Sequence, residues 1–171
     1  PGALEVIEYL ERNGIIAAIG HTDGDANDAA AAIDAGASVV THFTNAMSKL
    51  RDGKNSFAQR VFDDSRIALE LIVDGVHVPF AEVLEIFEKA PDRIILISDA
   101  MSAAGKPDGD YKIGPLDVEV SKSIARLKSN GALAGSTLTL ARAAENAIRA
   151  GVPKELVDHA TTSAPKLLLN V

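Results

Sequence analysis

Four side chains that can bind a metal or carry protons recur along the 171-residue chain. Each follows a short apolar run with the character of a buried strand: His21, His42, His77 and Asp99. Neutral imidazoles are suitable ligands for zinc or iron, and a bound metal lowers the pKa of a water molecule towards neutrality. A carboxylate can take the proton from that water and pass it to a leaving amine, while a further imidazole can stabilise an oxyanion. The pattern therefore indicates metal-assisted hydrolysis.

The elements that would position these residues alternate between strand and helix. Strands are predicted at residues 15–19, 38–41, 67–73 and 94–97, and helices at residues 4–10, 25–35, 57–62 and 79–89. Strands that are apolar on both faces and alternate with helices indicate an α/β fold with a parallel sheet. In such folds, and above all in (β/α)8 barrels, the carboxyl ends of the strands meet on one face. We therefore expect the four residues to converge there.

The pattern changes between about residues 111 and 130. Gly114–Val120 and Ile124–Leu127 alternate apolar and polar residues around a polar turn, which predicts a β-hairpin insertion. A helix is expected from about Thr139 to Ala150, and a last one from Pro153. His159 falls within that last helix, where a surface or packing role is expected. We interpret residues 1–171 as a single domain.

Composition restricts the class of partner. The net charge is −7 and the Lys and Arg residues are not clustered, which argues against a nucleic-acid partner and favours small molecules or other subunits. No apolar stretch approaches the roughly 20 residues that cross a bilayer, and no signal peptide is recognisable, so a cytoplasmic location without a membrane partner is expected. Because the chain has no cysteine, a metal must be held by His and carboxylate ligands. A first residue of Pro1 suggests a start within a longer gene product.

Five segments give the chain a family resemblance. They are Gly20-His21-Thr22-Asp23, Thr41-His42-Phe43-Thr44-Asn45-Ala46-Met47, Asp74-Gly75-Val76-His77-Val78, Ser98-Asp99-Ala100-Met101 and Leu133-Ala134-Gly135-Ser136-Thr137-Leu138-Thr139. In order and approximate spacing they resemble the N-acetylglucosamine-6-phosphate deacetylases of the amidohydrolase superfamily. The resemblance implies part of a (β/α)8 barrel, strands five to eight with their helices. The amino-terminal half of the barrel and a small β-sandwich domain would be absent from this chain.

The resemblance also implies roles for the polar residues. His21 and His42 match the histidine ligands of a divalent metal, zinc or iron. His77 matches the residue that contacts the N-acetyl carbonyl and stabilises the tetrahedral intermediate, and Asp99 matches the general base and acid. In the family a third ligand, a glutamate, comes from an earlier strand that this chain does not contain.

Substrate contacts are implied in the same way. Asn45 and Ala46 match contacts to the sugar phosphate, and Leu133 matches a residue that lines the sugar pocket. Gly53 falls where many members have an arginine that reaches the phosphate of a neighbouring subunit's substrate. Either Arg51 or Lys54 could replace that arginine, although a lysine offers a point charge rather than a bidentate fork.

The implied activity is hydrolysis of the acetamide of N-acetylglucosamine 6-phosphate to glucosamine 6-phosphate and acetate, by a homodimer. Two alternatives stay open at this point. One is a related amidohydrolase that acts on another amide. The other is a non-catalytic half-barrel that associates with itself through its unpaired strand edges.

Overall fold

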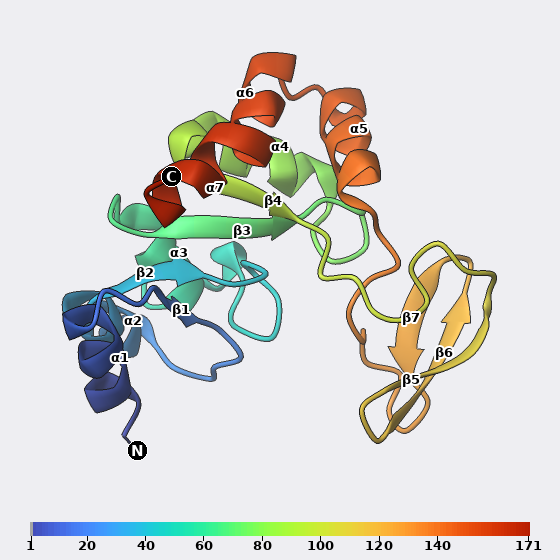
Figure 1. The fold of residues 1–171 in the computed structure, drawn as a ribbon, viewed down its shortest axis with the longest axis horizontal. Coiled ribbons are helices and arrows are strands. Elements are labelled where there is room, and N and C mark those ends of the chain that lie inside the picture. Colours follow the sequence, from blue (N-terminus) through green and yellow to red (C-terminus); the bar gives the residue numbers. More distant parts are fainter. Residues whose placement is uncertain (1) are drawn as a thin grey trace.

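Four parallel strands form the larger sheet of the protein, which the computed structural model describes over residues 2–171. In chain order, and side by side in the same order, they are β1 (Ala17–Ile19), β2 (Ala37–Val40), β3 (Ala68–Ile72) and β4 (Ile94–Ile97). Every neighbouring pair is parallel, with Val39 opposite Ala68 and Leu69 opposite Ile94. All four carboxyl ends therefore share one edge of the sheet (Figure 1). The α/β prediction is confirmed.

Helices connect these strands and flank them. They are α1 (Ala3–Arg12), α2 (Ala26–Asp34), α3 (Phe57–Asp63), α4 (Phe80–Lys89), α5 (Leu140–Ala150), α6 (Lys154–Asp158) and α7 (Ala164–Leu169). Short 3-10 turns occur at Leu50–Asp52 and Pro91–Arg93, and a π-helical turn at His159–Ser163 joins α6 to α7. In Figure 1, α1 to α3 gather around β1 and β2, whereas α4 to α7 gather beside β3 and β4.

The amino terminus of α2 shows how local sequence fixes a helix next to the strand ends. Asp25 Oδ1 accepts hydrogen bonds from the backbone N–H of Asn27 at 2.7 Å and of Asp28 at 3.1 Å. Asp28 Oδ2 in turn accepts the N–H of Asp25 at 2.9 Å. This reciprocal capping box satisfies N–H groups that have no partner within the helix. It makes α2 begin only a few residues after His21, so the loop between β1 and α2 is short.

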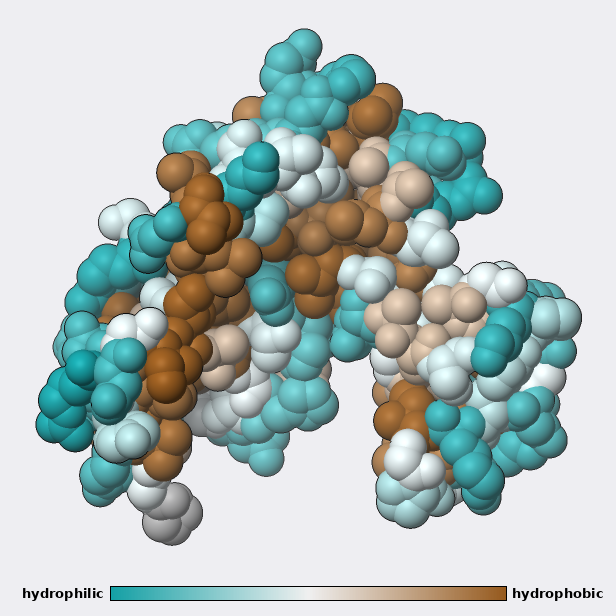
Figure 2. Space-filling model, in the orientation of Figure 1, coloured by the Kyte–Doolittle hydropathy of each residue, from teal (hydrophilic) through white to brown (hydrophobic). Residues whose placement is uncertain are grey.

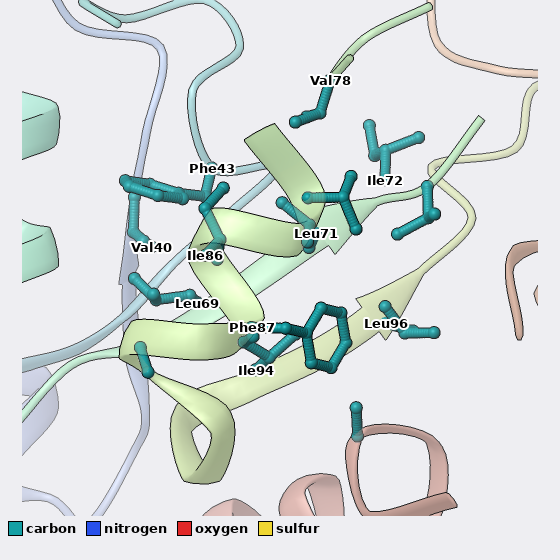
Figure 3. Close-up of a cluster of buried hydrophobic side chains, with 14 of the residues drawn as sticks. Val40, Phe43, Leu69, Leu71, Ile72, Val78, Ile86, Phe87, Ile94 and Leu96 are labelled. Atoms are coloured by element: carbon teal, nitrogen blue, oxygen red, sulfur yellow. The ribbon is translucent and has the colours of Figure 1, made fainter. Parts of the chain in front are cut away.

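The main apolar core lies between the sheet and the helices α2 to α6, with α4 among them. Figure 3 shows Ile86 and Phe87 of α4 packed over the strand residues Leu69, Leu71 and Ile94, all of which are buried. Burying a side chain of this size contributes about 1.5–3 kcal/mol relative to leaving it exposed. The core therefore gives β3 and β4 a rigid base, from which the loops at their carboxyl ends project.

The insertion is a three-stranded antiparallel sheet rather than the predicted two-stranded hairpin. Its strands are β5 (Gly109–Ile113), β6 (Leu116–Ser121) and β7 (Ile124–Leu127). The prediction placed Gly114 and Pro115 in a strand, but they form the turn between β5 and β6. Gly114 adopts a left-handed φ of 54°, and proline has no N–H to donate to a ladder.

The small sheet has a cluster of buried residues of its own, which includes Val118, Val120 and Ala125. It stands to one side of the main body, with a hollow visible between the two in the space-filling view (Figure 2). A side-chain hydrogen bond from Thr137 Oγ1 to the carbonyl of Ser123, at 2.6 Å, ties it to the segment that enters α5.

The edge strand β1 is shorter than predicted. The prediction began it at Ile15, yet Ile15 and Ile16 are 51% and 38% exposed and precede the pairing with β2. Because β1 has a strand on one side only, nothing on its free side extends the ladder to these residues. Apolar surface runs along this side of the molecule (Figure 2). Among residues 2–171, no helix is both long and apolar enough to cross a membrane.

Candidate metal and acid-base site

Three of the four predicted residues share an uncommon backbone conformation directly after a strand. His21, His42 and Asp99 each lie two positions beyond β1, β2 and β4, with positive φ values of 46°, 34° and 48°. A left-handed conformation is uncommon for a residue with a side chain and costs about 1–3 kcal/mol, so it persists only where the surroundings impose it. Such outliers cluster at functional sites, and here they coincide with three of the residues that the sequence predicts to carry the chemistry.

The two histidines after β1 and β2 are brought together. The ring centroids of His21 and His42 lie 4.6 Å apart, edge to face, at an interplanar angle of 81°. The adjoining loops are also joined, because the N–H of Thr22 donates to the carbonyl of Ala46 at 2.9 Å. Gly20 allows the close approach: a Cβ at this position would lie 2.6 Å from Cγ2 of Thr41. Of the four residues expected to converge, His21 and His42 therefore lie side by side.

The tautomer of His42 follows from its hydrogen bond. Nδ1 of His42 lies 3.1 Å from the backbone carbonyl oxygen of Asn45. A carbonyl can only accept, so Nδ1 must carry the proton, and Nε2 keeps a free lone pair. Metal-ligating histidines are usually oriented by such a bond from the other ring nitrogen. The buried ring of His42, 8% exposed, is therefore prepared to act as a ligand.

The loop that carries His42 is held in an unusual conformation. Thr44 and Ala46 have positive φ values of 67° and 51°. Within the loop, the N–H of Asn45 donates to the carbonyl of His42 at 2.9 Å, and Nζ of Lys49 donates to the carbonyl of Thr44. Burial lowers the pKa of Lys49 below its ordinary value, and the nearby Glu82 carboxylate offsets only part of this effect. These contacts hold the turn that contains Asn45 and Ala46 in one conformation.

His77 is oriented by a carboxylate that the sequence analysis did not assign to the site. Nδ1 of His77 lies 2.7 Å from Oδ2 of Asp74, and Oδ1 of Asp74 accepts the N–H groups of Val76 and His77, each at 2.8 Å. Burial opposes ionisation of Asp74, but the hydrogen bonds from the side chain and backbone of His77 outweigh it and keep the Asp74 pKa below its ordinary value. The i, i+3 spacing in Asp-Gly-x-His is the signal that points to this pair.

The segment around Ser136 holds Asp99 in place. The N–H of Ser136 donates to the carbonyl of Asp99 at 2.7 Å, and the N–H of Met101 donates to the carbonyl of Ser136 at 2.8 Å. The Ser136 hydroxyl also donates to the carbonyl of Ser98. Gly135, at φ 61°, passes so near that a Cβ would lie 3.1 Å from the Asp99 carbonyl oxygen. The backbone of Asp99 is therefore fixed while its side chain stays exposed.

Comparisons with known proteins place the chain in a family, although no family model matches it. It is 37% identical over 145 residues to N-acetylglucosamine-6-phosphate deacetylase of Vibrio furnissii, covering 85% of this chain and 36% of that protein. It is 36% identical over 171 residues to N-acetylgalactosamine-6-phosphate deacetylase of Escherichia coli O157:H7, covering 99% and 45%. A shorter relative from Escherichia coli (strain K12), named as a candidate N-acetylgalactosamine-6-phosphate deacetylase, is 37% identical over 131 residues that cover 78% of its length.

The chain belongs to the N-acetylglucosamine-6-phosphate deacetylase family. Solved structures agree: the enzyme of Mycobacterium smegmatis, a mutant in complex with N-acetyl-D-glucosamine-6-phosphate, matches with a TM-score of 0.93 at 38% identity, over 99% of this chain and 46% of that one. The enzyme of Pasteurella multocida matches with a TM-score of 0.92 at 28% identity, over 98% and 44%. The chain thus spans less than half the length of the full-size deacetylases it matches.

The remaining residues expected from the deacetylase family lie in separate places. Asn45 and Ala46 lie in the His42 loop. The Asn45 carbonyl accepts from Nδ1 of His42, and the Ala46 carbonyl accepts from the N–H of Thr22. Leu133 is half-buried and pairs with Arg126 of β7, so it belongs to the small sheet. Gly53 follows the 3-10 turn at φ 94°, with open space where a Cβ would be. Over residues 2–171 no three His, Asp or Glu side chains are grouped to hold a metal.

Proposed function

We propose that the protein of which this chain is a part hydrolyses the acetamide of N-acetylglucosamine 6-phosphate to glucosamine 6-phosphate and acetate. The observation that carries the proposal is the His21–His42 pair, with Nδ1 of His42 bonded to the Asn45 carbonyl, in a chain of this family. The names of its relatives and the sugar phosphate in the M. smegmatis complex support this substrate class.

A divalent metal, zinc or iron, would be held by His21 and His42. The donor chemistry fits, because two neutral imidazoles on facing loops suit either ion and His42 presents a free Nε2. The described residues supply these two ligands and no third, so we propose that a carboxylate from the part of the deacetylase outside this chain completes the set. When bound, such a metal activates water and polarises the scissile carbonyl.

The residues of this chain would then handle protons and charge. Asp99, fixed in backbone and exposed in side chain, would accept a proton from the attacking water and return it to the amine nitrogen as the C–N bond breaks. His77 would donate from Nε2 to the carbonyl oxygen as negative charge develops there. The Asp74 carboxylate holds the ring for this role and compensates a positive imidazolium. Asn45 and Ala46 would meet the sugar phosphate, and Leu133 would line the sugar pocket.

The open edge of the sheet supports a partial barrel. β1 has a free side, and a cavity of about 900 Å³ runs along it, lined by the apolar face of α1, by β1 and by His21. We propose that β1 to β4 are strands five to eight of a (β/α)8 barrel and that the first four strands close it by pairing with the free edges of β1 and β4. A homodimer and a cytoplasmic location remain predictions that accompany this assignment.

A second candidate concerns the chain alone. Leu4, Val6, Ile15 and Ile16 are exposed beside the free edge of β1, and unpaired edges readily accept another strand. A chain without the rest of the barrel could therefore associate with a second copy and have no activity. Gly53 bears on a third candidate, a related amide substrate, because it leaves phosphate recognition without the arginine found in many members.

The test is acetate release from N-acetylglucosamine 6-phosphate by the metal-loaded, full-length deacetylase. Asp99→Asn should lower turnover by roughly 10²–10⁴-fold, the usual contribution of general acid–base catalysis, while metal content stays unchanged. Equal turnover on the unphosphorylated sugar would favour the related amide substrate. An inert wild-type protein that holds its metal would show that the substrate assignment is wrong.

A further inference from the structure

A second cavity lies between the small sheet and one face of α5. Its volume is about 660 Å³, within the usual range for small-molecule sites. Its walls come from the β6–β7 turn, the loop before β5, the loop after β3 and the face of α5 that carries Arg142 and Arg149. Figure 1 shows α5 and the small sheet on the same side of the molecule. None of His21, His42, His77 or Asp99 lines it.

The cavity concentrates positive charge in a chain whose net charge is −7. Four cationic side chains line it: Lys106, Lys122, Arg142 and Arg149. The one carboxylate on its wall is Asp74, whose two oxygens already accept hydrogen bonds from the His77 segment. A concave surface lined by one sign of charge focuses the electrostatic field and attracts ions of the opposite sign.

The positive charge of these side chains is only partly neutralised by ion pairs within the protein. Arg142 and Arg149 share one partner, Glu145, at 2.9 Å and 4.0 Å, and Glu145 does not line the cavity. Over the part of the chain that the structure describes, neither Lys106 nor Lys122 forms an ion pair. Lys106 lies 5.9 Å from the ring centroid of a tyrosine, which leaves its ammonium charge uncompensated.

Neutral hydroxyl groups complete the lining. Ser123 and Thr139 border the cavity, and the 11-residue α5 begins at its wall with Thr139 as the N-cap. Thr137 also lines the cavity, but its hydroxyl already donates to the Ser123 carbonyl. The first-turn N–H groups of a helix and its positive dipole end add to the attraction of an anion. A dianion with several acceptor oxygens suits a combination of arginine forks, lysine point charges and hydroxyl groups.

We infer that this cavity is a second anion site, which binds the phosphate dianion, either as inorganic phosphate or as the phosphate group of a sugar phosphate. The inference goes beyond the proposed deacetylation and does not depend on it, because the site shares none of the metal or acid–base residues. Its wall carries Asp74, so an anion bound there would lie near the carboxylate that orients His77.

The test is a titration of ¹⁵N-labelled protein with inorganic phosphate at constant low ionic strength, read from backbone amide shifts. We expect shifts at Ser123, Thr137 and Arg142. In the variant Lys122→Asn/Arg149→Gln the affinity should fall by at least about tenfold, the loss expected for removing charged hydrogen-bond donors. Asparagine is a suitable replacement because Lys122 has a φ of 52°, a conformation that asparagine tolerates.

A matched control removes the same two charges elsewhere: Arg12→Gln/Lys166→Gln, at the end of α1 and on α7, should bind phosphate as tightly as wild type. A second titration with glucosamine 6-phosphate separates the sources, since stronger binding through the same amides identifies the sugar phosphate as the ligand. Shifts confined to the Asn45–Gly53 loop, or equal affinity in both double variants, would overturn the inference. This experiment measures phosphate binding and not acetate release, so its outcome is independent of whether the deacetylase proposal holds.

Discussion

At the scale of single residues, the site is defined by how each imidazole is held. Nδ1–H of His42 donates a hydrogen bond to a backbone carbonyl, which leaves the Nε2 lone pair free for a metal. Nδ1 of His77 instead contacts the carboxylate of Asp74. In the proposed function the same type of side chain therefore takes two roles, metal ligand at His42 and hydrogen-bond donor at His77. The neighbours of a histidine, rather than its position after a strand, decide which role it can take.

His42→Asn should therefore remove the metal. Asparagine tolerates the left-handed backbone at this position, so the substitution tests the ligand more than the fold. Metal bound per chain of the full-length protein, measured by elemental analysis after dialysis, should fall well below the wild-type value. The matched control is His159→Asn at the half-buried start of the π-helical turn, which should keep the metal. Full metal content in the His42 variant would exclude this histidine as a ligand.

At the scale of elements, a cluster at the end of α3 sets the start of β3. Asp64 is buried and accepts from Arg60 at 2.9 Å and from Arg66 at 2.9 Å and 2.8 Å. The Arg66 side chain, followed by its backbone N–H and by Arg60, holds the pKa of Asp64 far below its ordinary value of 3.8, against the opposing effect of burial. The helix end and the strand start are thus joined through one carboxylate.

Asp64→Asn should destabilise the fold by about 1–2 kcal/mol at neutral pH, because charged hydrogen bonds to two partly exposed arginines are lost. Since the folded-state pKa lies below 3.8, the ionised carboxylate stabilises the fold above that pH, and its contribution disappears as the pH falls towards the folded-state value. Urea unfolding midpoints should therefore differ most near pH 7 and converge at acid pH. The control Asp63→Asn, at the exposed residue just before Asp64, should change the unfolding midpoint little. A difference in midpoint between wild type and Asp64→Asn that stays constant down to low pH would contradict the pH linkage.

The sequence correctly predicts the elements that depend on residues close together in the chain. The strand Ile94–Ile97, the Asp25 cap of α2 and the helix that follows Ser56 all rest on neighbouring residues, and the structure confirms them. The β5 strand was missed because its polar residues are exposed and its apolar partners lie on β6. Asp74 also follows a strand, β3, but its place after the strand does not show that its carboxylate bonds the His77 ring, because that contact depends on the conformation of the loop.

At the scale of the whole molecule, the sheet is open. β1 and β4 each have a neighbour on one side, and the small sheet stands apart from the main body (Figure 1). The predicted residues line one edge of this open sheet, but the described residues supply two imidazoles and no third ligand. In the proposed function, the loops carry part of a deacetylase site, and residues outside 2–171 close the sheet and complete the set of metal ligands.

The open β1 edge leads to a final prediction about self-association of the 171-residue chain. Ile16 is 38% exposed just before β1, beside the free strand edge. A charge at a strand edge opposes pairing with another chain, so Ile16→Lys should shift the chain towards monomer in sedimentation velocity across a concentration series. Leu116→Lys places the same charge on an exposed position of the small sheet and should leave the oligomeric state as in wild type. A wild-type chain that stays monomeric at every concentration would show that this edge does not recruit a second copy, and would favour its role as the docking site for the first half of the barrel.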